Sequence, residues 1–206
     1  MLVFTKCAAQ RNDLRFGIQF SNFEDQVQPT LEFDGLDTCP VIDRDLVFSN
    51  KYDLYLEGEA FPLPESVKTS FVSIDLMDFC DGAKQGVSRV DFEDGDSLSC
   101  IGRIRLSDQF DSYLIRHISK KQWTKVIKIY MVNVKSNKPL SIIGLSQYAI
   151  GSGFSLRIYT IQYKNNRFIQ KSESYASDVI ELNRRKIKAD KGHSFTIDDN
   201  GIIKVL

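Results

Sequence analysis

The run Thr124-Lys-Val-Ile-Lys-Ile-Tyr-Met-Val-Asn-Val134 decides the fold class of this chain. It is rich in β-branched and aromatic residues, which favour strands, and it contains neither glycine nor proline. The residues that follow it, Ser-Asn-Lys-Pro at 136–139, include asparagine and proline, which are typical of turns. This stretch therefore predicts a long β-strand that ends in a sharp reversal of the chain.

The alternation of strand and turn continues to the last residue. Gly151-Ser152-Gly153 and Asn165-Asn166 are turn signals between further runs of apolar and β-branched residues. Asn200-Gly201, flanked by two short apolar runs, is the dipeptide most typical of a tight hairpin. Strands are expected at residues 140–149, 154–163, 167–175, 195–197 and 202–205. The second half of the chain thus predicts an antiparallel meander.

The first half gives weaker signals of the same kind. Alternating apolar residues predict a strand at 14–20, and Asp94-Gly95 is a hairpin signal between two runs of strand character. Further strands are expected at 30–33, 53–57, 70–76, 87–92 and 98–106. The two prolines of Phe61-Pro-Leu-Pro-Glu65 cannot donate to a sheet, so this segment predicts a loop and a candidate seam near 61–66.

Residues 107–118 fit two structures. Phe110, Tyr113, Leu114, His117 and Ile118 share one helix face, but residues 113–118 also suit a strand beside 124–134. The strand is preferred. Residues 13–206 are accordingly expected to form one mainly β domain, an antiparallel meander that builds a β-sandwich or a propeller-like sheet with little helix.

The charge of the chain is balanced overall but divided along its length. The 206 residues contain 27 Lys and Arg and 27 Asp and Glu, yet residues 1–103 carry a net charge of −10 and residues 104–206 a net charge of +10. The even balance argues against a nucleic-acid-binding protein. The division predicts either two halves that attract each other within the fold or a molecule with an acidic surface for cations or basic partners.

The first ten residues, Met-Leu-Val-Phe-Thr-Lys-Cys-Ala-Ala-Gln, place a short apolar run before Cys7 and small residues after it. This pattern resembles the lipobox of bacterial lipoproteins. The resemblance implies lipid attachment at Cys7, removal of residues 1–6 and a location in the cell envelope or periplasm. An export signal needs roughly 7–15 apolar residues, so this interpretation requires a segment upstream of Met1. Lys6, where the family has a small residue, leaves open an ordinary N-terminal strand within residues 1–12 of a cytoplasmic protein.

Four cysteines stand at Cys7, Cys39, Cys80 and Cys100. No spacing among them is typical of a zinc site. If Cys7 carries lipid outside the cytoplasm, one disulfide and one free thiol are expected, with Cys80 and Cys100 as the preferred pair. In the cytoplasm all four are expected to be reduced and buried.

The remaining polar residues offer little chemistry. The only histidines are His117 and His193, and no serine stands in the motif that exposes a nucleophile, so a non-enzymatic protein without cofactor is predicted. The acidic residues near Gly95 are a weak calcium candidate, although a solvated turn is preferred. These are Asp91, Glu93, Asp94 and Asp96. The basic run at 184–191 predicts a solvated connector or a contact with anionic headgroups.

These observations favour a lipid-anchored binding module of the bacterial envelope, with a membrane anchor and an unidentified protein partner. Two alternatives remain: a cytoplasmic partner protein of the antitoxin or immunity type, and a hydrolase without a recognisable motif. A hydrolase would need an open cleft in which a histidine meets carboxylates.

Overall fold

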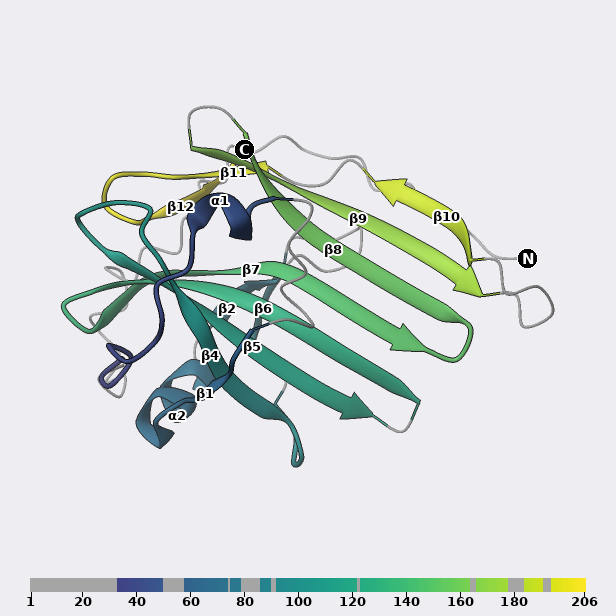
Figure 1. Cartoon of the computed structure of the whole chain (residues 1–206), viewed down its shortest axis with the longest axis horizontal. Helices are drawn as coiled ribbons and strands as arrows, with labels where there is room; N and C mark the ends of the chain where they lie inside the picture. Colours follow the sequence, from purple (N-terminus) through teal and green to yellow (C-terminus); the bar gives the residue numbers. More distant parts are fainter. Residues whose placement is uncertain are drawn as a thin grey trace.

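The computed structural model describes residues 33–49, 58–73, 75–78, 86–89, 92–121, 123–163, 166–177, 184–190 and 194–206. This part of the chain is mainly β with two short helices, α1 (Arg44–Val47) and α2 (Glu65–Ser73) (Figure 1). The strands are β1 (Phe61–Pro62), β2 (Asp75–Asp78), β3 (Gly86–Arg89), β4 (Ser97–Ile104), β5 (Asp111–Lys121), β6 (Thr124–Lys135), β7 (Lys138–Gly151), β8 (Phe154–Tyr163), β9 (Arg167–Ser177), β10 (Arg184–Asp190), β11 (Ser194–Ile197) and β12 (Ile203–Val205).

The described strands form one open sheet whose main path is an antiparallel meander. Its order is β1-β4-β5-β6-β7-β8-β9-β11-β12, and β10 pairs with the part of β9 that β11 leaves free. A single parallel pair joins β2 to β7, and β3 pairs with β2. The predicted mainly β meander with little helix is confirmed.

The central strands match the expected ones closely. β6 covers the predicted strand at 124–134, and β8 has the predicted bounds. Residues 113–118 belong to β5, which pairs with β6 over its whole length, so the helix alternative is wrong. Gly201, at a φ of +80°, forms the predicted turn between β11 and β12. The expected strands at 14–20 and 53–57 lie outside the described residues.

Two predictions in the first half are wrong. Most of the expected strand at 70–76 belongs to α2, because Val67 and Phe71, four residues apart, both bury completely against the sheet. The Phe71 ring meets Tyr130 of β6 edge to face, with centroids 5.3 Å apart. Asp94-Gly95 does form a turn, but the strands on either side of it do not pair: β3 pairs with β2, whereas β4 pairs with β1 and β5.

The sheet is buried on both faces at one end. Tyr130 and Val132 of β6 point into a cluster that α2 and residues 33–39 cover. Ile129 and Met131 point to the other face, into a cluster with α1, β11 and β12. Because β6 is covered on both sides, its sequence is a nearly continuous apolar run and not an alternating one. The proline-containing segment at 61–65 adds Phe61 and Leu63 to the first cluster.

A disulfide fastens the N-terminal described segment to β4. Cys39 is bonded to Cys100, with their Cα atoms 6.5 Å apart. Beside it the backbones of Ile42 and Arg103 pair, with 2.8 Å from the Ile42 amide nitrogen to the Arg103 carbonyl oxygen. The expected Cys80–Cys100 pair is therefore wrong, because Cys100 is already bonded to a cysteine on the chain that crosses it. Cys80 lies outside the described residues.

Candidate functional site

The end of the sheet away from α1 and α2 carries the turns between β5 and β6 and between β7 and β8 (Figure 1). We define the basic rim as residues 120–121, 123–125, 150–155, 175–177 and 184–186. These positions are far apart in the sequence and come together only through strand pairing. Two rows of paired residues cross the rim. The first is Lys121, Thr124, Gly151, Phe154, Ala176 and Arg185, and the second is Lys120, Lys125, Ile150, Ser155, Tyr175 and Lys186.

The charge of the rim has one sign. It contains six basic residues and no acidic residue, namely Lys120, Lys121, Lys125, Arg184, Arg185 and Lys186. Lys120 and Lys125 are exposed and lie directly opposite each other on neighbouring strands. Like charges in this position repel and destabilise a sheet. An anion bound beside these two lysines would remove this cost.

Exposed apolar side chains lie among these charges. Trp123 is 72% exposed in the β5–β6 turn, while Phe154 is 45% and Ile150 38% exposed at the neighbouring turn. The two turns touch at Gly151, where a Cβ atom would lie 3.2 Å from the Trp123 carbonyl oxygen. The rim is thus a protruding tip that combines large apolar side chains with lysines.

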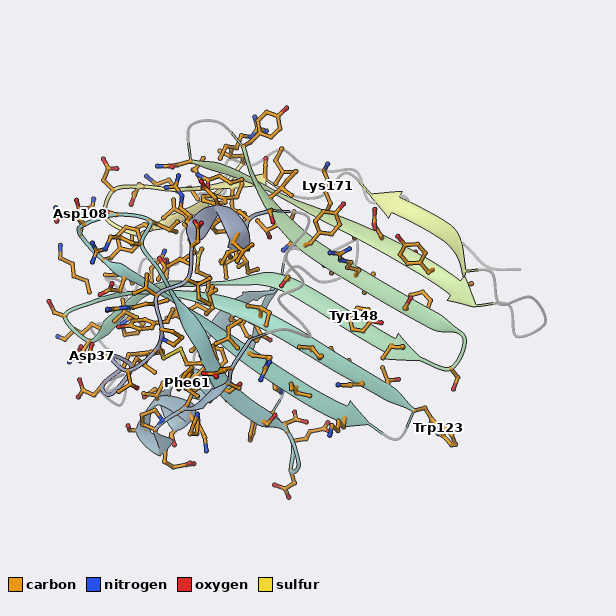
Figure 2. The ribbon with its side chains drawn as sticks, in the orientation of Figure 1. Asp37, Phe61, Asp108, Trp123, Tyr148 and Lys171 are labelled. Carbon is orange, nitrogen blue, oxygen red and sulfur yellow. A yellow bond between two sulfur atoms is a disulfide. The ribbon has the colours of Figure 1, made fainter. Side chains whose placement is uncertain are left out.

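Acidic residues lie beside the rim as well as away from it: Asp96 accepts from Ser119, the neighbour of Lys120, and the exposed Glu93 and Asp94 belong to the same turn as Asp96. Figure 2 shows Asp37 and Asp108 at the end of the molecule opposite Trp123. An open depression of about 490 Å³ lies on that acidic side, and its walls include Asp108 and Asp111 together with Lys135. This acidic end is mixed in charge, because Arg105 and Lys135 line the same depression as Asp108 and Asp111.

A buried pair joins His117 of β5 to Asp96, just before β4. The His117 Nε2 atom lies 2.9 Å from Asp96 Oδ2, and the two side chains are only 5% and 4% exposed. A carboxylate only accepts, so Nε2 carries the proton. Burial raises the pKa of Asp96, but hydrogen bonds from His117, the Glu93 backbone and Ser119 outweigh it, and the pKa lies below its usual value.

This pair lacks the geometry of a catalytic triad. In a triad the serine bonds to the imidazole, whereas here Ser119 and His117 both bond to the carboxylate. The other imidazole nitrogen, His117 Nδ1, is buried without a hydrogen-bond partner among the described residues. The structure therefore brings a histidine against a carboxylate, as a hydrolase requires, but both side chains are buried. His193 lies outside the described residues.

The acidic turn is not assembled around a cation. Asp91 lies outside the described residues, Glu93 and Asp94 are exposed, and Asp96 is turned toward His117. Among the residues that the structure describes, no three His, Cys, Asp or Glu side chains come together as metal ligands. Asp198 instead binds its own hairpin, accepting from the Asn200 and Ile202 amides and pairing with Lys204 at 3.0 Å.

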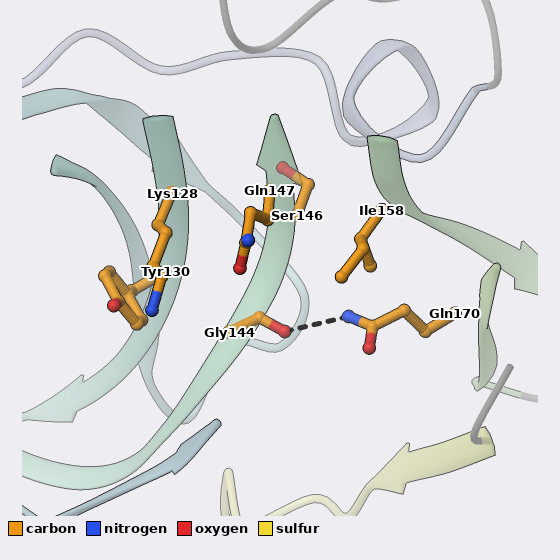
Figure 3. A pocket seen from close by; sticks show the side chains of 7 residues that line it. All are labelled: Lys128, Tyr130, Gly144, Ser146, Gln147, Ile158 and Gln170. Atoms are coloured by element: carbon orange, nitrogen blue, oxygen red, sulfur yellow. Dashed lines mark hydrogen bonds between the residues drawn. The ribbon is translucent and has the colours of Figure 1, made fainter. Parts of the chain in front are cut away.

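A second, very small depression of about 10 Å³ lies where the pairing between β7 and β8 ends (Figure 3). Leu145 is an extra residue in β7 relative to β6, so its carbonyl misses the regular ladder. Side chains of β8 and β9 bind the freed carbonyls: Thr160 donates to Leu145, and Gln170 donates to Gly144 at 3.0 Å and to Leu145. The space holds one water molecule at most, so its role is structural.

No relative identifies this chain. None of the protein-family models, curated proteins or solved structures compared with it matches. Within the described ranges, no helix has the length and apolar character needed to cross a bilayer. The function must therefore be inferred from the geometry.

The basic run at 184–191 was expected to be a solvated connector, but residues 184–190 form a strand, and the exposed aromatic residues of the rim were not anticipated. Part of that run is β10, which pairs with the end of β9. Trp123 and Phe154 lie far from it in the sequence and join the same rim through the registers of the strands between them. The order and register of the strands, which the sequence alone does not reveal, would have been needed to predict this rim.

Proposed function

We propose that this chain is an exported, lipid-anchored protein of the bacterial envelope that acts as a non-enzymatic binding module. The observation that carries the proposal is the disulfide between Cys39 and Cys100. Disulfides persist in oxidising compartments outside the cytoplasm and are rare within it. The bond joins positions 61 residues apart. The bond therefore closes a long loop, as expected for a stabilising disulfide of an exported chain.

The arrangement of the four cysteines agrees with the lipobox-like start. Once Cys39 and Cys100 are bonded, Cys7 and Cys80 remain. Cys7 is the residue that the resemblance to lipoproteins makes the lipid acceptor. It lies outside the described residues. The 25 residues between Cys7 and Phe33 span at most about 90 Å.

A binding role is supported by what the surface offers. Lys120, Trp123 and Lys125 of the basic rim are exposed, which suits attachment to a negatively charged partner. The His117–Asp96 pair is buried and its polar contacts are structural. Binding at the rim thus explains more of the structure than catalysis at the pair does.

The test is acylation of Cys7 in a bacterium that expresses the gene with its native upstream region. The wild-type protein should incorporate labelled palmitate and sediment with membranes. Cys7→Ser should lose the label, whereas the matched control Cys80→Ser should retain it. An unlabelled wild-type protein in the cytoplasmic fraction would contradict the proposal and favour a cytoplasmic interaction protein.

A further inference from the structure

We propose that the basic rim docks on an anionic phospholipid bilayer, with Trp123 entering the interface between headgroups and acyl chains. The inference takes its biological setting from the proposed envelope location. It concerns a different part of the molecule from the lipid anchor, namely the turns at the end of the sheet away from α1 and α2.

The apolar part of the rim has the form that an interfacial contact needs. Trp123, Phe154 and Ile150 are exposed at two adjoining turns, and Figure 2 shows Trp123 projecting outward from the end of the β5–β6 pair. Tryptophan is enriched at membrane interfaces because its ring is apolar and its indole N–H can still bind polar groups. The turn beside it is Gly151-Ser152-Gly153, whose small residues let the tip approach a surface closely.

The charged part of the rim is complementary to anionic headgroups. Lys120 and Lys125 are exposed on the two strands that the turn with Trp123 connects. Basic residues near a membrane each strengthen attraction to anionic lipid. The nearest described carboxylates are those of the turn at 93–96, where Asp96 is engaged by His117 and Ser119, so Glu93 and Asp94 are the exposed charges that the lysines must outweigh.

The shape favours a lipid surface over a ligand with a fixed outline. The two depressions described above are lined by other parts of the sheet, and neither includes a residue of the rim. A turn that carries an exposed tryptophan can sink into a fluid layer, whereas a nucleic acid or peptide is usually held in a cleft or along a flat stacking platform. We therefore assign the tip to a bilayer.

The experiment uses the full-length Cys7→Ser protein, which carries no lipid, and vesicles of phosphatidylcholine with or without phosphatidylglycerol. Trp123 is the only tryptophan in the chain, so its fluorescence reports on the rim alone. The protein should sediment with the anionic vesicles and less at high salt. Its emission should shift to shorter wavelength, and lipids brominated on the acyl chain should quench it.

The variant Lys120→Glu/Lys125→Glu should lower the vesicle partition coefficient by at least about 25-fold, roughly fivefold for each residue. Its matched control is Lys135→Glu/Lys138→Glu, a second exposed and directly opposed lysine pair at the acidic end. The control should change partitioning by less than about twofold, since those lysines lie far from the rim. Unchanged unfolding midpoints would show that both variants fold.

Three results would overturn the inference. The first is that the protein binds neutral and anionic vesicles equally. The second is that the Trp123 emission does not change with vesicles but shifts with a soluble polyanion. The third is that the two double variants lose the same amount of vesicle binding. The second result would assign the rim to an acidic polymer or protein. The vesicle experiment uses Cys7→Ser throughout and does not depend on acylation. Vesicle binding without acylation of the wild type would contradict only the proposed lipid anchor. Acylation of the wild type without vesicle binding would contradict only the proposed docking.

Discussion

Lys120 lies directly opposite Lys125 across the β5–β6 pair, and both side chains are exposed at the tip of the sheet. The next paired position is Lys121 opposite Thr124, and Trp123 occupies the turn that follows. Like charges at opposed positions cost stability. The tip thus combines charge repulsion with exposed apolar side chains, two features that isolated folding does not favour and that contact with an anionic surface would stabilise.

The repulsion gives the first prediction. Lys125→Glu converts the opposed pair into one of opposite charge, so it should raise the free energy of unfolding by about 0.5–1 kcal/mol at low salt. Urea unfolding measures the change, which should shrink as salt is added. The same substitution should weaken vesicle binding, so stability and binding should move in opposite directions.

Lys138→Glu is the matched control because Lys138 lies opposite Lys135 in the same way. It should raise stability by a similar amount and leave vesicle binding unchanged. If Lys125→Glu lowered stability in low salt while Lys138→Glu raised it, the repulsion inferred at the rim would be wrong.

The second prediction concerns the disulfide. Replacing both Cys39 and Cys100 by alanine opens a loop between positions 61 residues apart, which should lower the free energy of unfolding by up to about 4 kcal/mol. Denaturant unfolding under non-reducing conditions measures the loss. A reducing agent should destabilise the wild type and have no such effect on the double variant. Equal stability of the two proteins without reductant would show that the bond does not support the fold.

The third prediction is a dependence on pH from Asp96. Burial alone would raise the pKa of Asp96. The hydrogen bonds from His117, Glu93 and Ser119 lower it by more, so in the folded protein the pKa of this carboxylate lies below its usual value. The unfolded chain then binds a proton more readily than the folded one. The stability that Asp96 contributes is present above its unfolded pKa, and it is lost as the pH falls from about 5 through the folded value.

Asp96→Ala should therefore lower the free energy of unfolding at pH 7 by about 1.5–3 kcal/mol, because it removes a hydrogen bond to a charged group. Its stability should also decline less steeply below pH 5 than that of the wild type. Thermal unfolding between pH 3 and 7 measures both effects. Asp94→Ala, at an exposed turn, should change stability by less than about 0.5 kcal/mol and serves as the control. Parallel pH profiles for wild type and Asp96→Ala would refute the assignment.

The fourth prediction concerns a buried amide. Asn133 of β6 is fully buried and accepts from the Ser112 hydroxyl at 2.7 Å. Its Nδ2 atom donates to Ser141 at 3.0 Å and to the Gly201 carbonyl at 2.8 Å, so it joins β5, β7 and the β11–β12 turn. Asn133→Ala should lower the free energy of unfolding by about 2–4 kcal/mol, since several buried groups lose their partner. Ser152→Ala at an exposed turn should leave urea unfolding unchanged, and an equally mild effect at Asn133 would contradict this account.

The sequence predicted the strands that lie in the meander because their signals are local. β-branched runs and turn residues determine β6, β8 and the Asn200-Gly201 hairpin without reference to distant residues. The helix α2 was missed because residues 70–76 also have strand character. The helix is stabilised because it buries both Val67 and Phe71, which are four residues apart and lie on one face of a helix.

The site was less accessible from the sequence. The Cys39–Cys100 bond depends on how the N-terminal segment crosses β4, which spacing along the chain does not reveal. The rim likewise depends on strand register, since a shift of one residue would send Trp123 and the lysines to different neighbours. Local pattern therefore determined the elements, and long-range pairing determined the site.

The most direct test of the envelope location is a count of free thiols on the protein purified from its native cells under denaturing conditions. With lipid on Cys7 and Cys39 bonded to Cys100, alkylation should label one thiol, Cys80, before reduction and three after it. Mass spectrometry of the intact chain reads both numbers. Four thiols labelled before reduction would contradict the account, because they would mean an unlipidated chain in a reducing compartment.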